Sequence, residues 1–190
     1  VILLVSCNPR EEKESCDVVD LTPFQNEEVS DDIVQYVEDV QLIALETSDS
    51  CLIMSYPEHI VVDDDRIVIE EHQVSRQPVK IFDRKGQFIA SVKTGQGPGE
   101  VSMVYAMAVD RKQRQILVYH SGGIMYYDYV GKCIKEDRID FDFSQFVVHG
   151  DELVFIVAGH QTNETLGENG GYKVYVMDRE FRNTCRKHYT

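Results

Sequence analysis

The sequence predicts an all-β protein built from repeated antiparallel modules of four strands. Short apolar runs alternate with turn residues along most of the 190 residues, and valine, isoleucine, tyrosine and phenylalanine dominate the apolar set. No segment keeps a 3.6-residue apolar period, so helix is a minor component. The order strand, strand, loop, strand, turn, strand also recurs at a nearly constant interval, which indicates a repeat architecture.

Two short strands and three modules are expected in order. The segments before the first module that predict strands are Val40–Glu46 and Leu52–Met54. The four strands of the first module are expected at 59–63, 66–70, 78–83 and 87–92. Those of the second are expected at 104–110, 115–119, 124–128 and 132–138. Those of the third are expected at 145–149, 152–157, 172–178 and 181–189.

Each module has an aspartate at the end of its third strand, and the spacing between these aspartates gives the length of the repeat. Asp83 and Asp128 are 45 residues apart, and Asp128 and Asp178 are 50 apart. Four antiparallel strands at this period are typical of β-propeller blades. The predicted fold is therefore an all-β propeller with about three blades. An antiparallel sandwich is the alternative, although it would not explain the recurring order.

The segment Gly95–Glu100, Gly-Gln-Gly-Pro-Gly-Glu, separates the first two modules. Glycine weakens a strand and proline lacks a backbone donor, so the segment is predicted to be a loop between two sheets. A phosphate-binding loop is disfavoured, because neither a Lys-Ser/Thr pair nor a helix follows.

These residues resemble a known family. Ile81–Ile89 followed by Gly95–Glu100 resembles the six-bladed β-propeller lipoproteins of Bacteroidetes, relatives of the NHL-repeat propellers, and Leu42–Thr47 resembles the opening strand of that family. The resemblance covers about residues 38 to 158. It implies that the three blades are half of a six-bladed ring. The chain would then be a fragment, a truncated gene product, or a half ring completed by a dimer.

The N-terminus resembles a lipoprotein signal. Leu4-Val5-Ser6-Cys7 follows an apolar run and is similar to a lipobox, which implies lipidation of Cys7 and a membrane anchor. Residues 1–7 are then a signal-peptide remnant, 8–32 a flexible acidic tether and 33–190 the partial propeller. The implied location is the outer membrane, facing the periplasm or the cell surface. An ordinary first strand with a buried cysteine is the alternative.

Charge and cysteine spacing exclude several classes of function. A formal net charge of −14 argues against nucleic-acid binding and against adsorption to an anionic membrane by charge alone. The other four cysteines show no Cys-x-x-Cys spacing, so neither a zinc site nor a redox dithiol is expected from them. They are expected to be free or buried thiols: Cys16, Cys51, Cys133 and Cys185.

One end of the modules collects the candidate site residues. In an antiparallel blade, the loop between blades and the loop between strands two and three lie at the same end. Five side chains there are expected to contact a ligand: His72, Arg76, Glu100, His120 and His160. Glu70 and Glu71 are expected to add polar contacts. The three histidines could instead hold zinc or a similar divalent metal, or be solvated loop residues.

The expected function is a non-catalytic binding or interaction module of the cell envelope. Its ligand would be a glycan or a peptide, with envelope proteins as further partners and no cofactor. Neither a Gly-x-Ser-x-Gly motif nor a pair of catalytic carboxylates is recognisable. The alternatives are a metal-dependent lyase or lactonase, as some six-bladed propellers are, and a structural scaffold, because a fold does not determine a function.

Overall fold

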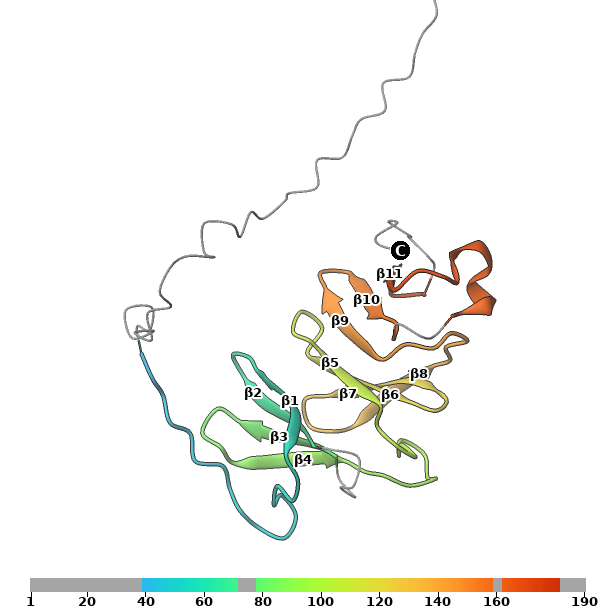
Figure 1. Ribbon diagram of the computed structural model, residues 1–190. Coiled ribbons are helices and arrows are strands. Elements are labelled where there is room, and N and C mark those ends of the chain that lie inside the picture. The colour runs from blue at the N-terminus through green and yellow to red at the C-terminus, as the bar shows by residue number, and fades with distance from the viewer. Residues whose placement is uncertain (1–38, 72–77, 159–161, 182–190) are drawn as a thin grey trace, which may run out of the picture. The chain divides into compact units, whose positions relative to one another are not determined.

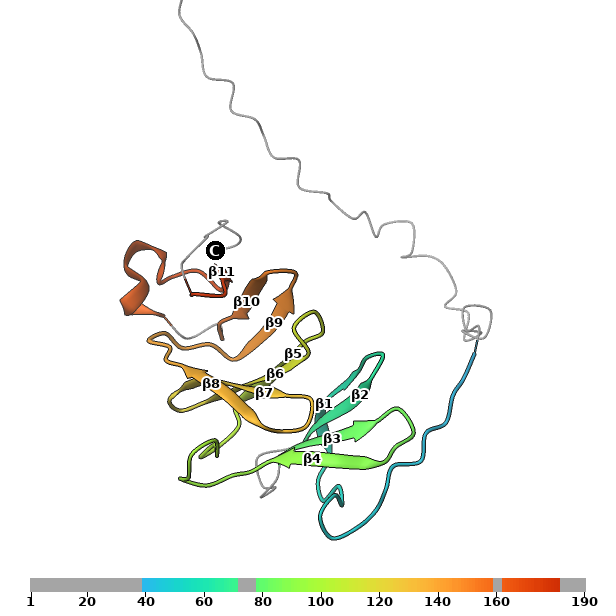
Figure 2. The ribbon, with the colours of Figure 1, turned by 180° about the vertical axis from the view of Figure 1, so that it is seen from behind.

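The computed structural model describes residues 39–71, 78–158 and 162–181 (Figure 1, Figure 2). Residues Leu42–Thr190 form one compact unit. Within its described part, this unit consists of three antiparallel sheets and one short 3-10 helix. None of the described helical residues forms a helix long and apolar enough to cross a membrane.

Each sheet is a meander in which strands that follow one another in sequence also pair. Blade 1 contains β1 (Pro57–Val62), β2 (Arg66–Glu71), β3 (Val79–Asp83) and β4 (Phe88–Val92). Blade 2 contains β5 (Ala106–Asp110), β6 (Gln115–His120), β7 (Gly123–Asp128) and β8 (Cys133–Asp137). The described part of blade 3 contains β9 (Gln145–His149), β10 (Glu152–Ile156) and β11 (Val174–Asp178), with the 3-10 helix η3 (Glu164–Asn169) before β11.

These successive meanders are propeller blades, so the predicted all-β propeller fold is confirmed and a two-sheet sandwich is excluded. The predicted strands of the first two modules are all present, with ends that differ by one or two residues. In the third module the first three strands are present. The predicted strand at 181–189 lies, except for its first residue, outside the described residues.

The prediction of two strands before the first module is wrong. Val40–Glu46 and Leu52–Met54 contain no strand; Ile43, Leu45 and Ile53 instead pack against the side of blade 1 that faces away from blade 2. The backbone approaches the β3–β4 turn at one point, where Glu46 N–H donates to the Gly86 carbonyl at 2.7 Å. A Cβ at Gly86 would lie 2.0 Å from the Ala44 carbonyl oxygen, so glycine is needed for this approach.

Blade 2 is buried on both faces. Ile116 and Val118 of β6 pack toward blade 1, whereas Leu117 between them packs toward blade 3. This alternation is the period of two of a strand, applied to a sheet that lies between two others. The interface with blade 3 is rich in aromatic rings: Phe141, Phe143, Phe146, Phe155 and Tyr175. The two interfaces hold the blades of this unit against one another.

The third strand of each blade ends at one of the three aspartates whose spacing gives the repeat length. Each of these aspartates caps the turn that follows its strand. The carboxylates of Asp83, Asp128 and Asp178 each accept the backbone N–H two residues ahead, at 2.8, 3.0 and 2.9 Å. A register shift also recurs just before the turn, between Ile81 and Phe82 in blade 1 and between Tyr126 and Tyr127 in blade 2. The blades therefore repeat the geometry of this turn and of the bulge before it, as well as the order of the strands.

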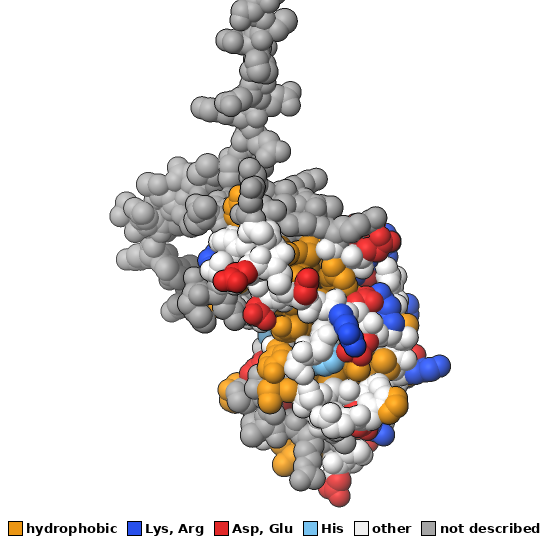
Figure 3. Space-filling view, turned by 90° about the vertical axis from the view of Figure 1, so that its right-hand side faces the viewer, with side chains coloured by type: hydrophobic (Ala, Val, Ile, Leu, Met, Phe, Trp, Pro, Cys, Tyr) orange, Lys and Arg blue, Asp and Glu red, His pale blue; other side chains and the backbone are white. Residues whose placement is uncertain are grey.

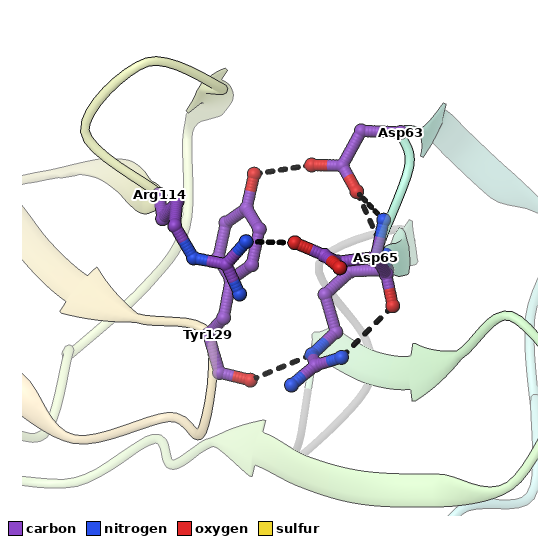
Figure 4. Close-up of polar contacts among 5 residues, drawn as sticks. Asp63, Asp65, Arg114 and Tyr129 are labelled. Carbon is purple, nitrogen blue, oxygen red and sulfur yellow. Dashed lines mark hydrogen bonds and ion pairs between the residues drawn. The ribbon is translucent and has the colours of Figure 1, made fainter.

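A polar clasp joins the turns of blades 1 and 2 (Figure 4). The Tyr129 hydroxyl donates to the Asp63 carboxylate, and Arg114 pairs with Asp65. The Arg114 guanidinium also lies over the Tyr129 ring, 5.1 Å from its centroid. Arg66 Nε donates to the Tyr129 carbonyl at 3.2 Å. Burial, and then the hydrogen bond to Asp63, raise the pKa of Tyr129 well above its usual range.

The same positions form a second contact between blades 2 and 3. Arg179 follows the turn aspartate Asp178, as Tyr129 follows Asp128. Its Nη2 lies 2.7 Å from Oδ2 of the fully buried Asp110, which ends β5. In both pairs, the residue after the turn aspartate contacts the aspartate at the end of the first strand of the preceding blade.

Replacing Tyr129 with phenylalanine is expected to lower the free energy of unfolding by about 2 kcal/mol, because the Asp63 carboxylate loses a donor at a buried interface. Urea unfolding of the full chain measures it. Tyr105→Phe is the matched control, since this ring is 43% exposed and the change is expected to stay within about 0.5 kcal/mol. Equal losses in the two variants would contradict the clasp.

Candidate functional site

The loop between blades 1 and 2 is held in place at both its base and its tip. Thr94 and Val101 form a parallel bridge at the base. Near the tip, the hydroxyl of Tyr127 on β7 donates to the Gly99 carbonyl at 3.1 Å. Burial raises the pKa of Tyr127 well above its usual range, which further favours the protonated phenol that donates this bond. The predicted turning role of this segment is confirmed.

The glycines of the loop surround the carboxylate of Glu100. Gly97 N–H donates to Glu100 Oε2 at 3.0 Å, while Glu100 N–H donates to the Gly97 carbonyl at 3.0 Å. A Cβ at Gly95 would lie 2.0 Å from the same carboxylate oxygen and would displace it. The Gly-x-Gly-Pro-Gly-Glu pattern therefore fixes the direction of one acidic side chain.

His120 ends β6 and faces the same loop. Its Nδ1 accepts the Gly122 N–H at 3.3 Å, which places the proton of the neutral ring on Nε2. Nε2 lies 3.2 Å from Oε1 of Glu136 on β8, but it has no hydrogen bond of good geometry within the described residues. Because the imidazole is only 9% exposed, this donor is buried, and it lies next to the Glu136 carboxylate.

These groups line a hollow of about 470 Å³, here named the loop hollow. Its walls are the glycine-rich loop, His120, Ser121 and Glu136, and the hydroxyls of Ser102 and Ser121 lie 3.0 Å apart at its margin. Figure 3 views the side on which the loop lies in Figure 1, and shows a histidine and charged side chains of both signs among hydrophobic ones. The loop hollow offers donors and acceptors in a small volume, as polar ligands require.

A second hollow of about 470 Å³ adjoins the first, because Ser121 lines both. This second hollow, here named the tyrosine hollow, is lined by Tyr105, Tyr119, Ser121, Asp142, Phe143 and Ser144. The Tyr119 ring stacks on Phe143 with centroids 3.9 Å apart, and Tyr105 lies 5.5 Å from Tyr119. Burial, and then the nearby Asp142 carboxylate, raise the pKa of Tyr119. Aromatic rings therefore form one wall of this hollow, and Asp142 and two serines provide its polar groups.

A cavity of about 500 Å³ lies elsewhere, between the first strands of the three blades. Alanine and valine side chains, such as Ala106, Ala108 and Val147, make up much of its wall. Its polar groups include Asp110, which the contact with Arg179 already occupies. The loop hollow contains Glu100 and His120, whereas none of the residues expected to contact a ligand is among the described residues that line this cavity, so the two adjoining hollows are taken as the candidate site.

The structure brings two of the five predicted ligand residues together. Glu100 and His120 line the loop hollow, at the end of the blades where they were expected. His72, Arg76 and His160 lie outside the described residues. In the part of the chain that is described, no group of three or more His, Cys, Asp or Glu side chains is arranged to hold a metal ion.

The expectation that Glu70 and Glu71 provide surface contacts is wrong. Both are buried, and they serve the interior of blade 1. Glu70 Oε2 lies 2.8 Å from Nδ1 of His59, and burial raises the pKa of the Glu70 carboxyl. Glu71 forms an ion pair with the buried Lys80. The end of β2 turns inward because two neighbouring strands supply partners for these carboxylates.

Of the cysteines, two are described. Cys51 is buried and Cys133 half-buried, and both are free thiols. Burial raises the pKa of the Cys133 thiol. Cys7, Cys16 and Cys185 lie outside the described residues.

Three residues of the site were missed from the sequence: Glu136, Tyr105 and Asp142. Glu136 lies opposite Met125 only because of the register shift in the β7–β8 pair; an unbroken hairpin would place Lys135 there. Tyr105 was assigned to a strand that begins one residue later. Asp142 precedes β9 in a loop where it alternates with the buried Phe141 and Phe143, and this loop carries no recognisable motif. The position of Glu136 could have been inferred only with knowledge of blade 1, because the β3–β4 pair has the same register shift at the equivalent place.

With this geometry established, comparison with known proteins identifies the family. The model of a domain of unknown function, DUF4934, matches residues 16–189. The chain belongs to the DUF4934 family. The description of this family specifies no activity, and no curated protein of similar sequence was found.

Solved structures resemble this DUF4934 protein in fold. A protein described as exported, from Bacteroides fragilis, superposes with a TM-score of 0.65 at 21% identity, over 80% of this chain and 42% of that one. The WD40 domain of Pan2 from Neurospora crassa gives 0.46 at 15% identity, over 68% of this chain and 35% of that one. PorZ, a surface component of the type-IX secretion system of Porphyromonas gingivalis, gives a TM-score of 0.43 at 11% identity, over 67% of this chain and 15% of that one. The DUF4934 chain thus spans less than half of the Bacteroides fragilis protein.

Proposed function

We propose that this DUF4934 protein is a non-catalytic binding module of the cell envelope, and that its ligand, a glycan or a peptide, occupies the loop face of the blades. The observation that carries this proposal is the pair of adjoining hollows, which combine acidic, hydroxyl and imidazole groups in a fixed frame. Among the described residues, the two serines at the junction of the hollows pair with each other and His120 accepts from a backbone amide. The arrangement therefore contains hydrogen-bonding groups without an activated nucleophile.

The location and the ring are further parts of the proposal. Resemblance to an exported protein and the lipobox-like Leu4–Cys7 support secretion, lipidation of Cys7 and attachment to the outer membrane, facing the periplasm or the surface. The NHL-like six-bladed resemblance and the 42% share of the Bacteroides fragilis protein support a ring of which these three blades are half.

A screen of the full chain against glycan and peptide arrays tests the proposal, followed by titration of the strongest ligand. His120→Ala is expected to weaken binding at least about tenfold, since the buried Nε2 donor is lost. Glu136→Gln is expected to act in the same direction. Glu152→Gln is the matched control, because Glu152 starts β10 at the opposite end of the blade and should leave affinity unchanged.

A metal-dependent lyase or lactonase is the function that would replace this one. Elemental analysis of the purified chain distinguishes the two. Stoichiometric zinc or another divalent metal that is lost in His120→Ala, together with turnover of a lactone or polysaccharide, would overturn the binding-module proposal.

A further inference from the structure

The two hollows together have the form of one extended site. Each has a volume of about 470 Å³, within the roughly 300–1,000 Å³ typical of sites for small ligands. Ser121 lies in the wall of both, and its hydroxyl is 3.0 Å from that of Ser102. The two hollows therefore meet at Ser121, and a ligand that fills one hollow reaches a residue that also lines the other.

The tyrosine hollow presents an aromatic ring that is held in place from behind. Tyr105 is 43% exposed, and its backbone N–H donates to the Tyr119 carbonyl at 2.9 Å. The ring lies 5.5 Å from Tyr119, which is itself stacked on the buried Phe143. Because this support limits its movement, Tyr105 can offer a ring surface at a small cost in conformational entropy. The C–H faces of a pyranose ring pack against such a surface.

The polar groups around the Tyr105 ring can form hydrogen bonds with the hydroxyl groups of a sugar. Asn163 is buried and fixes the Asp142 backbone from both sides, accepting its N–H at 2.6 Å and donating to its carbonyl at 2.8 Å. The Asp142 carboxylate is thereby positioned at the tyrosine hollow. In the loop hollow, Nε2 of His120 forms no hydrogen bond of good geometry among the described residues, and the Glu136 carboxylate 3.2 Å away is an acceptor. Sugar hydroxyls donate and accept, so they match acceptors and donors placed side by side.

The charge of the site selects among saccharides. Three carboxylates, those of Glu100, Glu136 and Asp142, line the two hollows, and the described residues of their walls include neither lysine nor arginine. An anionic sugar would meet repulsion without compensation, in a chain whose formal net charge is −14. The site chemistry therefore favours a neutral saccharide.

We infer that the loop hollow and the tyrosine hollow form one site for a neutral oligosaccharide of at least two sugar units, with one unit packed on Tyr105 and the next beside His120 and Glu136. This inference rests on the proposed binding function and specifies its ligand class. Tyr105 is the residue that distinguishes a saccharide site from a general polar pocket.

Titration of the full chain with neutral oligosaccharides of one to four units tests the inference. Tyrosine fluorescence can report binding without interference from tryptophan emission, since the chain has ten tyrosines and no tryptophan. Isothermal calorimetry gives the affinity independently. The dissociation constant of one of the cello-, xylo-, malto- or chito-oligosaccharide series is expected to fall by about tenfold or more from one unit to two, because the second hollow is then filled. Little further gain is expected beyond the units that fit.

Variants at Tyr105 separate stacking from a structural effect. Tyr105→Ala is expected to weaken binding of the disaccharide by about tenfold, while Tyr105→Phe keeps the ring and should stay within about threefold. Tyr56→Ala, at a ring that is 65% exposed and does not line either hollow, is the control and should bind as the unmodified protein does.

The outcomes separate this inference from the proposed function. Equal affinity for one and two units, no effect of Tyr105→Ala, or preference for an anionic oligosaccharide would overturn the saccharide inference. A basic peptide that binds and depends on His120 and Glu136 would also overturn it while leaving the binding module intact. Failure of every glycan and peptide to bind the folded chain would overturn both.

Discussion

Replacing Phe155 with alanine is expected to lower the free energy of unfolding by about 3–5 kcal/mol. Phe155 on β10 is fully buried. Its ring lies 5.1 Å from that of Phe141, 4.8 Å from Phe143 and 5.9 Å from Phe146, centroid to centroid. Alanine would leave a cavity among rigid rings that cannot collapse into it, so the full cavity cost applies.

Urea unfolding followed by circular dichroism measures this loss. Phe155→Leu keeps most of the volume and is expected to cost less than alanine, which provides a result even if the alanine variant does not fold. Val147→Ala in the neighbouring strand β9 is the control, because this side chain is mostly exposed and its truncation should cost under about 0.5 kcal/mol. A loss below about 1 kcal/mol for Phe155→Ala would show that the interface between blades 2 and 3 is not packed as described.

Replacing Lys80 with methionine is expected to cost about 3–5 kcal/mol, because it removes the ammonium group that is paired with the buried Glu71 carboxylate. Glu71 also accepts the backbone N–H groups of Met54 and Ser55 at 2.6 and 2.9 Å. The ion pair therefore connects β3, β2 and the segment that covers the outer side of blade 1. Its loss is expected to loosen that segment as well as the sheet.

A double variant and a surface control make this prediction specific. Adding Glu71→Gln to Lys80→Met removes the buried carboxylate charge and should recover part of the lost stability, so the two effects are not additive. Lys85→Met, in the exposed β3–β4 turn, should change stability by less than about 0.5 kcal/mol. Hydrogen exchange at Met54 and Ser55 should rise in Lys80→Met alone. Additive losses in the double variant would contradict a coupled pair.

Much of the fold could be predicted because it is encoded locally. Asp83, Asp128 and Asp178 cap turns within their own hairpins, so their spacing reports the period directly. The continuous apolar run Ile116–Val118 in β6 likewise follows from burial of this strand on both faces. Val40–Glu46 is also rich in apolar residues but forms no strand, because the packing of Ile43 and Leu45 against blade 1 does not require their backbone to join the sheet.

The candidate site could be predicted less completely. Glu100 and His120 were found because strand order alone places their loops at one end of the blades. Glu136 was missed because one extra residue in β8 shifts the register. Glu70 and Glu71 were misplaced because their burial depends on His59 and Lys80, which come from neighbouring strands.

The amino-acid sequence by itself determined the blade, its period, its turns and the end of the blade at which its loops gather, since each depends on residues a few positions apart. Only the tertiary structure decided which acidic side chains are buried, which face a hollow, and that Tyr105 shares a wall with Ser121 and Asp142. The physical reason is that burial and pairing of a charged or aromatic side chain depend on neighbours from other strands and blades, and no local pattern specifies them.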